Sequence, residues 1–351
     1  MSSSHSEESR RRRAFRELHR AGCFVMPSPW DRGSAKYLEG LGFKALGTSS
    51  GGAAWSSGQA EGSLPMDRVL SHAQEIIEAT SLPVNVSFEA GFARSAEDLA
   101  RNVFAAANTG AAGIGIEDGT GDNANPVWDI ETASARLGVT RATLDALGPD
   151  APLLVGRAEN FWAGRADLAD TIKRLQAYAA AGADVLYAPG VTSRDGISAI
   201  VNDVHPKPVN VLVSSDIGLT LKDLAALGVR RISVGGALAR SAWGGFMRAA
   251  RSIAEDGRFD FDHPAIGKEL DSLFTYSTRT PSAVNATVAG RVEFRLGEGP
   301  LVIIPAGPVE IILSAADVVF GWTEGSSRQE AAIPFVNFCR YVATGDLILQ
   351  T

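Results

Sequence analysis

Short apolar runs alternate with longer segments of helical periodicity along most of the chain. The helix-like segments, such as DLADTIKRLQAYAAAG, end on glycine, as a helix C-cap commonly does. Continuous apolar strands that alternate with helices are typical of a parallel sheet buried on both faces. Eight runs are candidate strands: CFVMP (23–27), ALGTSS (45–50), LPVNVSFE (82–89), AGIGIED (112–118), PLLVGRAE (152–159), DVLYAP (184–189), PVNVLVS (208–214) and RISVGG (231–236).

Eight strand–helix units favour an α/β fold of the (β/α)8 TIM barrel type, which has this number of units. An open doubly wound sheet is the alternative. It needs a glycine-rich phosphate turn after its first strand, and the segment there is PSPWDRGSA. The sequence therefore predicts that residues 1–275 form a TIM barrel preceded by an N-terminal helix.

Residues 276–351 show a different pattern. Segments such as AVNATVAGRVEFRL and PLVIIPAGPVEIIL alternate apolar and polar residues between glycine-containing turns, which predicts β-hairpins. A small β-rich domain gains stability by docking. We therefore expect this extension to form a small domain or a cap that packs on the barrel or on a partner subunit.

Composition excludes several classes of partner. The net charge of −7 argues against general affinity for nucleic acid, and the basic run Arg10–Arg13 is expected to be the solvated face of a helix. The two cysteines, Cys23 and Cys339, lie far apart, which fits a reducing cytoplasm. The polar N-terminus and the absence of an apolar run of about 20 residues predict a cytoplasmic protein without a membrane contact.

The C-terminal ends of the predicted strands carry a cluster of charges. TIM barrels place their active sites at these ends, so the acids Glu89, Glu117, Asp118 and Glu159 are expected to meet Arg157 there. This set suits a hard divalent cation, Mg²⁺ or Mn²⁺. It also suits an anionic substrate, whose acid group Arg157 can bind in bidentate fashion. The alternatives are that an acid caps a helix, or that Arg157 simply pairs with one of its acidic neighbours.

Taken together, these motifs resemble the isocitrate lyase/phosphoenolpyruvate mutase superfamily from about residue 14 to residue 274. The resemblance implies a barrel that binds Mg²⁺ and a small 2-oxo acid or its enolate, and that cleaves or rearranges C–C or P–C bonds. It also implies a homo-oligomer, a dimer or a tetramer. The similar segments are PSPWDRGSAKYLEGLGFKALGTSSGG, LPVNVSFEAGFA, GAAGIGIEDGTGD, LLVGRAENFWAG, AYAAAGADVLYAPG and VRRISVGGALARSAWGGF.

By position, the resemblance implies that Glu117 is a metal ligand and that Glu89 acts on the metal through water. It implies that Arg157 holds the carboxylate of the substrate. Asp118 and Glu159, at the ends of neighbouring strands, complete the catalytic candidates. The remaining substrate-binding residues that it implies are Trp30, Asp31, Ser49, Ser50 and Gly51.

Two positions depart from the family pattern. Ser87 stands where the family usually has an aspartate that binds Mg²⁺ directly, and a hydroxyl is a poorer ligand than a carboxylate. Ser87 is therefore kept as a metal-site residue with an expected loss of affinity. The loop 119–128, GTGDNANPVW, lacks both the cysteine of the family's lyases and the lysine of its mutases.

The leading hypothesis is a Mg-dependent, lyase-type enzyme that acts on a small 2-oxo acid or phosphonate through an enolate. A decarboxylase or a hydrolase that needs no loop cysteine belongs to the same hypothesis. The alternative is a catalytically depleted barrel that serves as a binding or assembly module.

Overall fold

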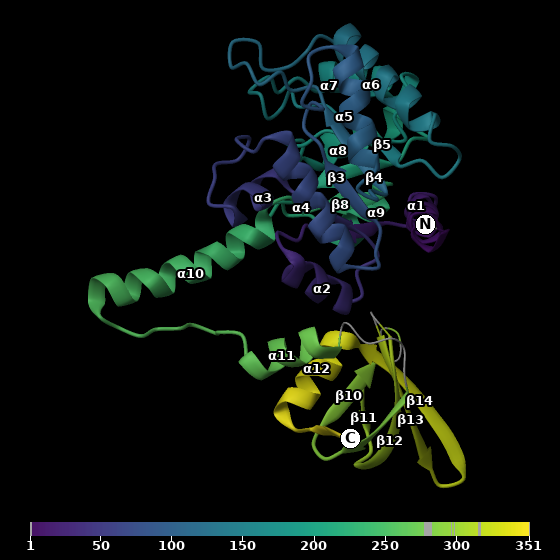
Figure 1. Ribbon diagram of the computed structural model, residues 1–351, viewed down its shortest axis with the longest axis vertical. Coiled ribbons are helices and arrows are strands. Elements are labelled where there is room, and N and C mark those ends of the chain that lie inside the picture. Colours follow the sequence, from purple (N-terminus) through teal and green to yellow (C-terminus); the bar gives the residue numbers. More distant parts are fainter. Residues whose placement is uncertain (1, 277–282, 296, 298, 315–316, 351) are drawn as a thin grey trace. The chain divides into compact units, whose positions relative to one another are not determined.

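Eight parallel strands form one sheet that closes almost completely into a barrel in the computed structural model (Figure 1). The structure describes residues 2–276, 283–295, 297, 299–314 and 317–350. Around the sheet, the strands follow their order along the chain. They are β1 (Phe24–Met26), β2 (Leu46–Gly47), β3 (Val84–Ser87), β4 (Gly113–Glu117), β5 (Leu153–Arg157), β6 (Val185–Tyr187), β7 (Val209–Leu212) and β8 (Arg231–Ser233).

Each of the eight apolar runs contains one of these strands, so the TIM-barrel prediction is confirmed. The runs fold as strands because their apolar side chains are buried, as those of Val84, Ile114 and Val185 are. The two ends of the sheet are β1 and β2, and no ladder joins them among the described strands. The N–H of Gly47 nevertheless donates to the carbonyl of Pro27 at 3.0 Å, which links the two strands.

Helices alternate with the strands. Several begin after a capping residue, such as Ser95 or Asp129, whose side chain accepts a hydrogen bond from a backbone N–H of the first turn. The helices up to residue 256 are α1 (Ser2–Leu18), α2 (Arg32–Gly40), α3 (Ser50–Ser56), α4 (Met66–Ala79), α5 (Ala96–Ala107), α6 (Ile130–Asp145), α7 (Leu168–Ala180), α8 (Arg194–Asp203), α9 (Leu221–Ala226) and α10 (Ala237–Asp256).

The N-terminal helix α1 packs on the barrel and differs from its expectation in one respect. Arg11 donates from Nη1 to the carbonyl of Ile77 at 2.9 Å, and Arg12 donates from Nη2 to the carbonyl of Ala107 at 2.8 Å. The expected solvated face is therefore wrong for these two arginines, which tie α1 to the barrel through backbone carbonyls.

His19 lies just after α1 and is 8% exposed. Its Nδ1 lies 2.7 Å from the carbonyl of Phe15, and its ring makes edge contacts with the rings of Phe15 and Phe24. Burial lowers the pKa of His19 to about 3, and the nearby cation Arg231 acts in the same direction. The folded protein therefore holds a neutral imidazole here.

This histidine is expected to make folding stability depend on pH. The unfolded chain takes up a proton near pH 6.5 and the folded chain near pH 3, so the stabilisation is complete above pH 6.5 and is lost as the pH falls. His19→Asn keeps an amide donor for Phe15 but does not titrate. Between pH 7.5 and pH 5, urea unfolding should show wild type losing about 2 kcal/mol more than the variant. Equal losses in the two proteins would contradict a buried neutral His19.

The chain divides into two compact units, Met1–Arg32 with Lys44–Trp243 and Gly33–Phe43 with Gly244–Thr351. The predicted domain boundary between residues 275 and 276 stays a prediction, because the adjacent residues 277–282 lie outside the described residues. The elements after residue 256 are α11 (Gly267–Tyr276), β9 (Ala283–Val288), β10 (Val292–Arg295), β11 (Leu301–Ile304), β12 (Gly307–Leu313), β13 (Asp317–Glu324), β14 (Ser327–Pro334), α12 (Phe335–Thr344) and β15 (Leu347–Leu349).

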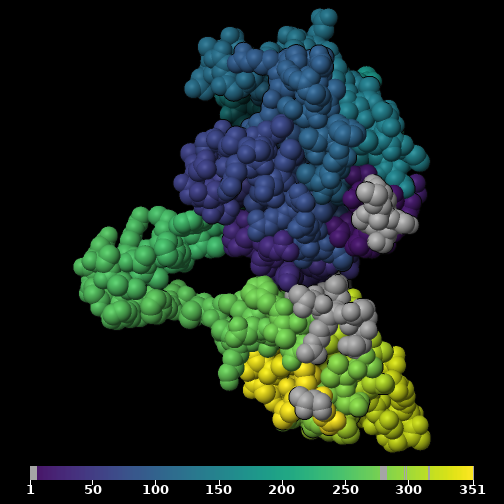
Figure 2. Space-filling view, viewed as in Figure 1, coloured from purple at the N-terminus to yellow at the C-terminus, as the bar shows by residue number. Residues whose placement is uncertain are grey.

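The C-terminal region has an apolar core of its own. Strands β14, β13, β12, β9 and β15 form an antiparallel sheet in this order, and β10 pairs with β11. Ile311 and Phe320 of the sheet are buried together with Phe338 of α12. Figure 2 draws this C-terminal region in green to yellow. The predicted β-rich extension is confirmed. Its packing on the barrel or on a partner subunit stays a prediction.

Helix α10 exposes several large apolar side chains. Trp243, Phe246 and Met247 are exposed, and an apolar face of this kind is typical of a surface that another chain covers. The predicted homo-oligomer stays a prediction, with this helix as a candidate contact.

None of the described helices combines the length and apolar character that a bilayer span requires.

Candidate active site

Two adjoining cavities open at the C-terminal ends of the barrel strands. The inner cavity has a volume of about 90 Å³ and reaches between the strands, whereas the outer cavity has about 620 Å³ and lies over the strand ends. Four residues line both cavities: Ser50, Glu61, Arg157 and Trp162. A small ligand can therefore contact both the outer acids and the barrel interior.

Arg157 is the last residue of β5 and lies between two acids. Its Nη1 is 3.2 Å from Oε2 of Glu117. Its Nε and Nη2 donate to the two carboxylate oxygens of Glu159, with 3.2 Å between Nη2 and Oε2. The rings of Trp162 and Tyr187 each lie 5.2 Å from the guanidinium carbon. Arg157 thus lies at the junction of the two cavities and forms the pairs with Glu117 and Glu159 that the sequence offered as an alternative; its predicted role in substrate binding stays a prediction.

Burial and charge act in opposite directions on this cluster. The pKa of Arg157 is raised because the nearby acids outweigh the effect of burial. Burial raises the pKa of Glu159 to about 7, although the Arg157 guanidinium acts against this shift. Glu159 can therefore exchange a proton near neutral pH, which is the property that a general acid or base requires.

Glu89 lies two residues after β3 in a strained backbone conformation. Its φ is +46°, a left-handed conformation that side chains other than glycine rarely adopt. Arg136 holds this loop by donating to the carbonyls of Ala90 and Ala93. The pKa of Glu89 is raised to about 7, first by burial and then by repulsion from Glu117. Strain of this kind concentrates at functional sites.

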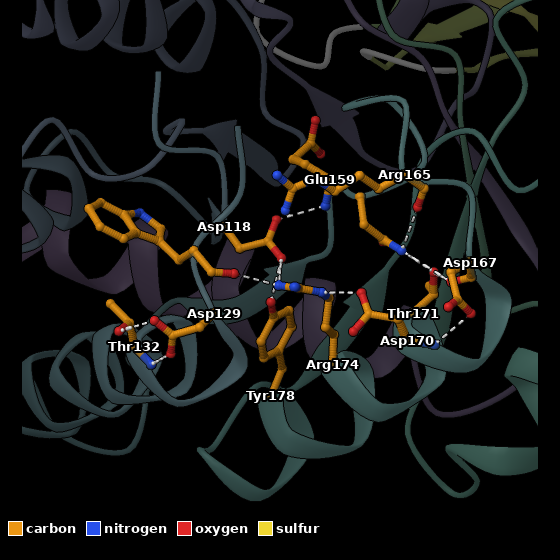
Figure 3. A network of polar contacts seen from close by, with 12 residues as sticks. Asp118, Asp129, Thr132, Glu159, Arg165, Asp167, Asp170, Thr171, Arg174 and Tyr178 are labelled. Atoms are coloured by element: carbon orange, nitrogen blue, oxygen red, sulfur yellow. Dashed lines mark hydrogen bonds and ion pairs between the residues drawn. The ribbon is translucent and has the colours of Figure 1, made fainter. Parts of the chain in front are cut away.

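Asp118 lies at the centre of a buried polar network (Figure 3). Its Oδ1 accepts from the N–H of Glu159 at 2.7 Å, and its Oδ2 accepts from Nη1 of Arg174 at 2.9 Å and from the hydroxyl of Tyr178. Its side chain is 1% exposed and does not line either of the two cavities described above. These contacts favour a positioning role for Asp118, and its predicted catalytic role stays a prediction.

The segment after β2 contributes Ser49 and Ser50 to the wall of the inner cavity. Ser49 caps α3 by accepting from the N–H of Gly52. At Gly51, a Cβ atom would lie about 3.1 Å from Oε2 of Glu61 and 3.0 Å from the Trp55 ring, so glycine allows the close approach of these side chains. Gly51 itself does not line either of the two cavities, and the role of the three residues in substrate binding stays a prediction.

Trp30 and Asp31, which the resemblance also implies, are absent from the described residues that line the two cavities. The carbonyl of Trp30 instead accepts from Nε2 of His72 at 3.0 Å. Their role in substrate binding stays a prediction.

Two residues of the site do not stand out in the sequence. Glu61 accepts from the hydroxyl of Ser50 at 2.9 Å and contributes to the raised pKa of Glu89. Trp162 stacks on Arg157. Both lie in loops away from strand ends, in AEG and NFWAG, so the strand-end rule does not select them. The clearest signal is the tryptophan itself, because a large aromatic residue beside a cluster of charges is unusual on a loop.

The acids of the outer cavity fit a hydrated divalent cation. Among the described residues, no group of three or more His, Cys, Asp and Glu could hold a metal ion directly. Mg²⁺ often uses only one or two carboxylates and keeps several waters. The mutual repulsion of Glu61, Glu89 and Glu117 would be relieved by such an ion. Ser87 lines the adjacent inner cavity and offers a neutral hydroxyl.

The loop 119–128 is held mainly by its own contacts. Thr120 accepts from the N–H of Asp122 and donates to the carbonyl of Asn125, and Gly119 forms a bridge with Val127. Gly119 and Thr120 line the outer cavity. Trp128 at the end of the loop lines this cavity as well, so the loop covers part of the site with backbone, a hydroxyl and an indole ring, without a thiol or an aliphatic amine.

Three comparisons place the chain among known proteins. A family model for phosphoenolpyruvate phosphomutase matches residues 15–254. An uncharacterised protein from Mycobacterium tuberculosis H37Rv is 31% identical over 274 residues, which are 76% of this chain and 98% of that protein. Oxaloacetate decarboxylase from Bradyrhizobium diazoefficiens is 30% identical over 200 residues, which are 56% of this chain and 69% of that enzyme.

A solved structure is similar to this chain as well. The structure of a candidate lyase/mutase from Burkholderia cenocepacia J2315 superimposes with a TM-score of 0.73 and 43% sequence identity. The match covers 77% of this chain and 97% of that chain.

Proposed function

The chain belongs to the phosphoenolpyruvate phosphomutase family, within the PEP mutase/isocitrate lyase superfamily, and from this premise we propose a lyase-type enzyme that uses Mg²⁺. Its substrate is a small 2-oxo acid or phosphonate, and the bond that breaks joins the carbon next to the 2-oxo group to its distal carbon (or phosphorus) substituent. The observation that carries the proposal is the position of Arg157, held between Glu117 and Glu159 where the two cavities join.

In this proposal, some residues of the site bind the substrate and the ion, and one residue transfers a proton. Arg157 orients the carboxylate of the substrate, together with the segment Ser49–Gly51. Glu89, Glu117 and Glu61 would hold a hydrated ion through its water molecules, and the ion would supply Lewis-acid polarisation of the 2-oxo oxygen. The electron pair of the broken bond stays on the carbon beside the 2-oxo group, as an enolate. Glu159, with its pKa near 7, then supplies the proton that this carbon takes up.

One relative supports a particular reaction. Oxaloacetate decarboxylase from Bradyrhizobium diazoefficiens releases CO₂, as its name states, and it aligns with more than half of this chain. A decarboxylation needs no thiol in the loop 119–128, because CO₂ leaves without accepting a proton. We therefore propose decarboxylation of a 2-oxo diacid as the first reaction to test.

The alternative function is a barrel that binds small acids without turnover. Ser87 supports it, because the position where the family usually has a metal-binding aspartate carries no charge. The buried charges around Arg157 weigh against it. Burying charges costs folding free energy, and a protein that serves only as a scaffold has no reason to retain them.

One experiment separates the two functions. Wild type, Ser87→Asp and the neutral control Ser87→Asn are titrated with Mg²⁺ and Mn²⁺ in the presence of oxalate, and are assayed with oxaloacetate and related 2-oxo diacids. Ser87→Asp is expected to bind Mg²⁺ about tenfold more tightly, because it adds a carboxylate, whereas Ser87→Asn gains nothing. Wild-type turnover supports the enzyme, and turnover in Ser87→Asp alone supports the binding module. The metal-dependent proposal fails if wild type binds neither ion at millimolar concentration.

A further inference from the structure

A second arginine, Arg231, lies inside the barrel at the first residue of β8. It is 1% exposed and lines the inner cavity together with Arg157. In the strand register, Arg157 is paired with Tyr187, Tyr187 with Asn210, and Asn210 with Arg231. All four residues line the same inner cavity, so two guanidinium groups face one small space.

Arg231 differs from Arg157 in having no acid beside it. Its Nε donates to Oδ1 of Asn210 at 2.8 Å, and Nδ2 of Asn210 donates to the hydroxyl of Ser233 at 2.9 Å. Nη1 of Arg231 is buried without a hydrogen-bond partner. Within the described parts of the chain, no carboxylate forms an ion pair with this guanidinium.

A buried cation without a counter-charge lowers the stability of the folded protein, because its lost hydration is not compensated. Burial lowers the pKa of Arg231 to about 10, so the group still carries its charge at neutral pH. His19 is held neutral and so adds no second positive charge beside Arg231. A water molecule can accept a hydrogen bond from Nη1 but cannot neutralise the charge. An anion that enters the cavity can do both.

We propose that Arg231 binds a second acid group of the substrate, a carboxylate or phosphonate, deep in the inner cavity. This inference rests on the proposed function: the carboxylate beside the 2-oxo group binds near Arg157 and Ser50, and the distal acid group reaches Arg231. The substrate is then a diacid. A volume of about 90 Å³ holds only a few water molecules, so the chain between the two acid groups is short.

The test compares ligands that differ only in the distal acid group. In the presence of Mg²⁺, the affinities of oxaloacetate and 2-oxoglutarate are measured against those of 2-oxobutyrate and 2-oxovalerate, which have the same chain lengths. Wild type is expected to prefer at least one diacid. In Arg231→Met, that diacid should bind about 10- to 100-fold more weakly, as expected for a lost charge-assisted hydrogen bond. The monoacids should keep their affinities, and Arg231→Lys should keep part of the preference.

Two further measurements keep this result interpretable. Unfolding of Arg231→Met without ligand shows whether the variant folds, and it should be at least as stable as wild type because an uncompensated buried charge is gone. In magnesium-free protein, sodium sulfate should raise the melting temperature of wild type more than that of the variant, at matched ionic strength. The sulfate measurement does not depend on the proposed function. If the proposed function is wrong, wild type will bind neither oxalate nor the metal ion. An unchanged diacid preference in Arg231→Met would overturn the proposal, and so would a destabilised variant with unchanged sulfate response.

Discussion

Replacing Arg157 with glutamine is expected to lower kcat/KM about 100- to 1,000-fold and to destabilise the protein by about 3–5 kcal/mol. The loss of activity is expected because, in the proposed function, the carboxylate of the substrate loses its charged donor. The loss of stability follows because Glu117 and Glu159 lose their counter-charge while they stay largely buried. Initial rates and urea unfolding measure the two effects separately.

Two controls separate the role of Arg157 in binding from its role in folding. The double variant Arg157→Gln/Glu159→Gln removes one of the acids left without a partner, so it should regain stability without regaining activity. Arg194→Gln breaks an exposed ion pair with Asp223 and should cost less than about 1 kcal/mol. Full oxalate affinity in Arg157→Gln would show that the substrate is held elsewhere.

Asp118→Asn is expected to destabilise the protein by about 3 kcal/mol and to reduce turnover through Glu159. The amide keeps the size of the carboxylate, but only its oxygen accepts hydrogen bonds. It therefore cannot accept from Arg174, Tyr178 and the N–H of Glu159 in the way that the two carboxylate oxygens do. Arg174 then lies buried with less compensating charge. Because the N–H of Glu159 is fixed by Asp118, the position of this proposed proton donor should loosen as well.

The matched control is Asp170→Asn, on the other side of the same arginine. Asp170 contacts Nε of Arg174 at 2.7 Å, but its side chain is 35% exposed, so water replaces the lost contact at little cost. Temperature-dependent unfolding and the pH profile of kcat are measured for both variants. A variant Asp118→Asn that is as stable as wild type and yet inactive would identify Asp118 as a catalytic residue, as the sequence predicted, and would refute the positioning role.

The fold could be predicted from the sequence because parallel barrels bury their strands on both faces. Runs such as LPVNVSFE and DVLYAP are short, apolar and separated by helical periodicity, and each became a strand of the barrel. The arginines of α1 were harder to predict. Whether Arg12 faces solvent or donates to the carbonyl of Ala107 depends on how the helix docks, and a single helix pattern does not contain that information.

The charged part of the site was predictable for the same topological reason. Glu117 ends β4, whereas Arg157 and Glu159 lie at the end of the neighbouring strand β5, and strand ends of a barrel meet. The rule fails for Glu61, which a loop between α3 and α4 brings to Ser50. It also fails for Arg231, which begins its strand and points into the barrel. A charged residue within a run that must be buried on both faces is the signal that could have identified it.

The backbone at Glu89 has a consequence for how such a chain changes over generations. A left-handed conformation costs a residue with a side chain on the order of 1 kcal/mol, and Glu89 also carries a carboxyl that burial holds back from ionising. Glycine would remove both costs. Without selection for catalysis, random drift should therefore replace Glu89 early, because the replacement raises the free energy of unfolding. Descendants that retain an acid at this position, despite that penalty, are the lineages in which the chemistry is still under selection.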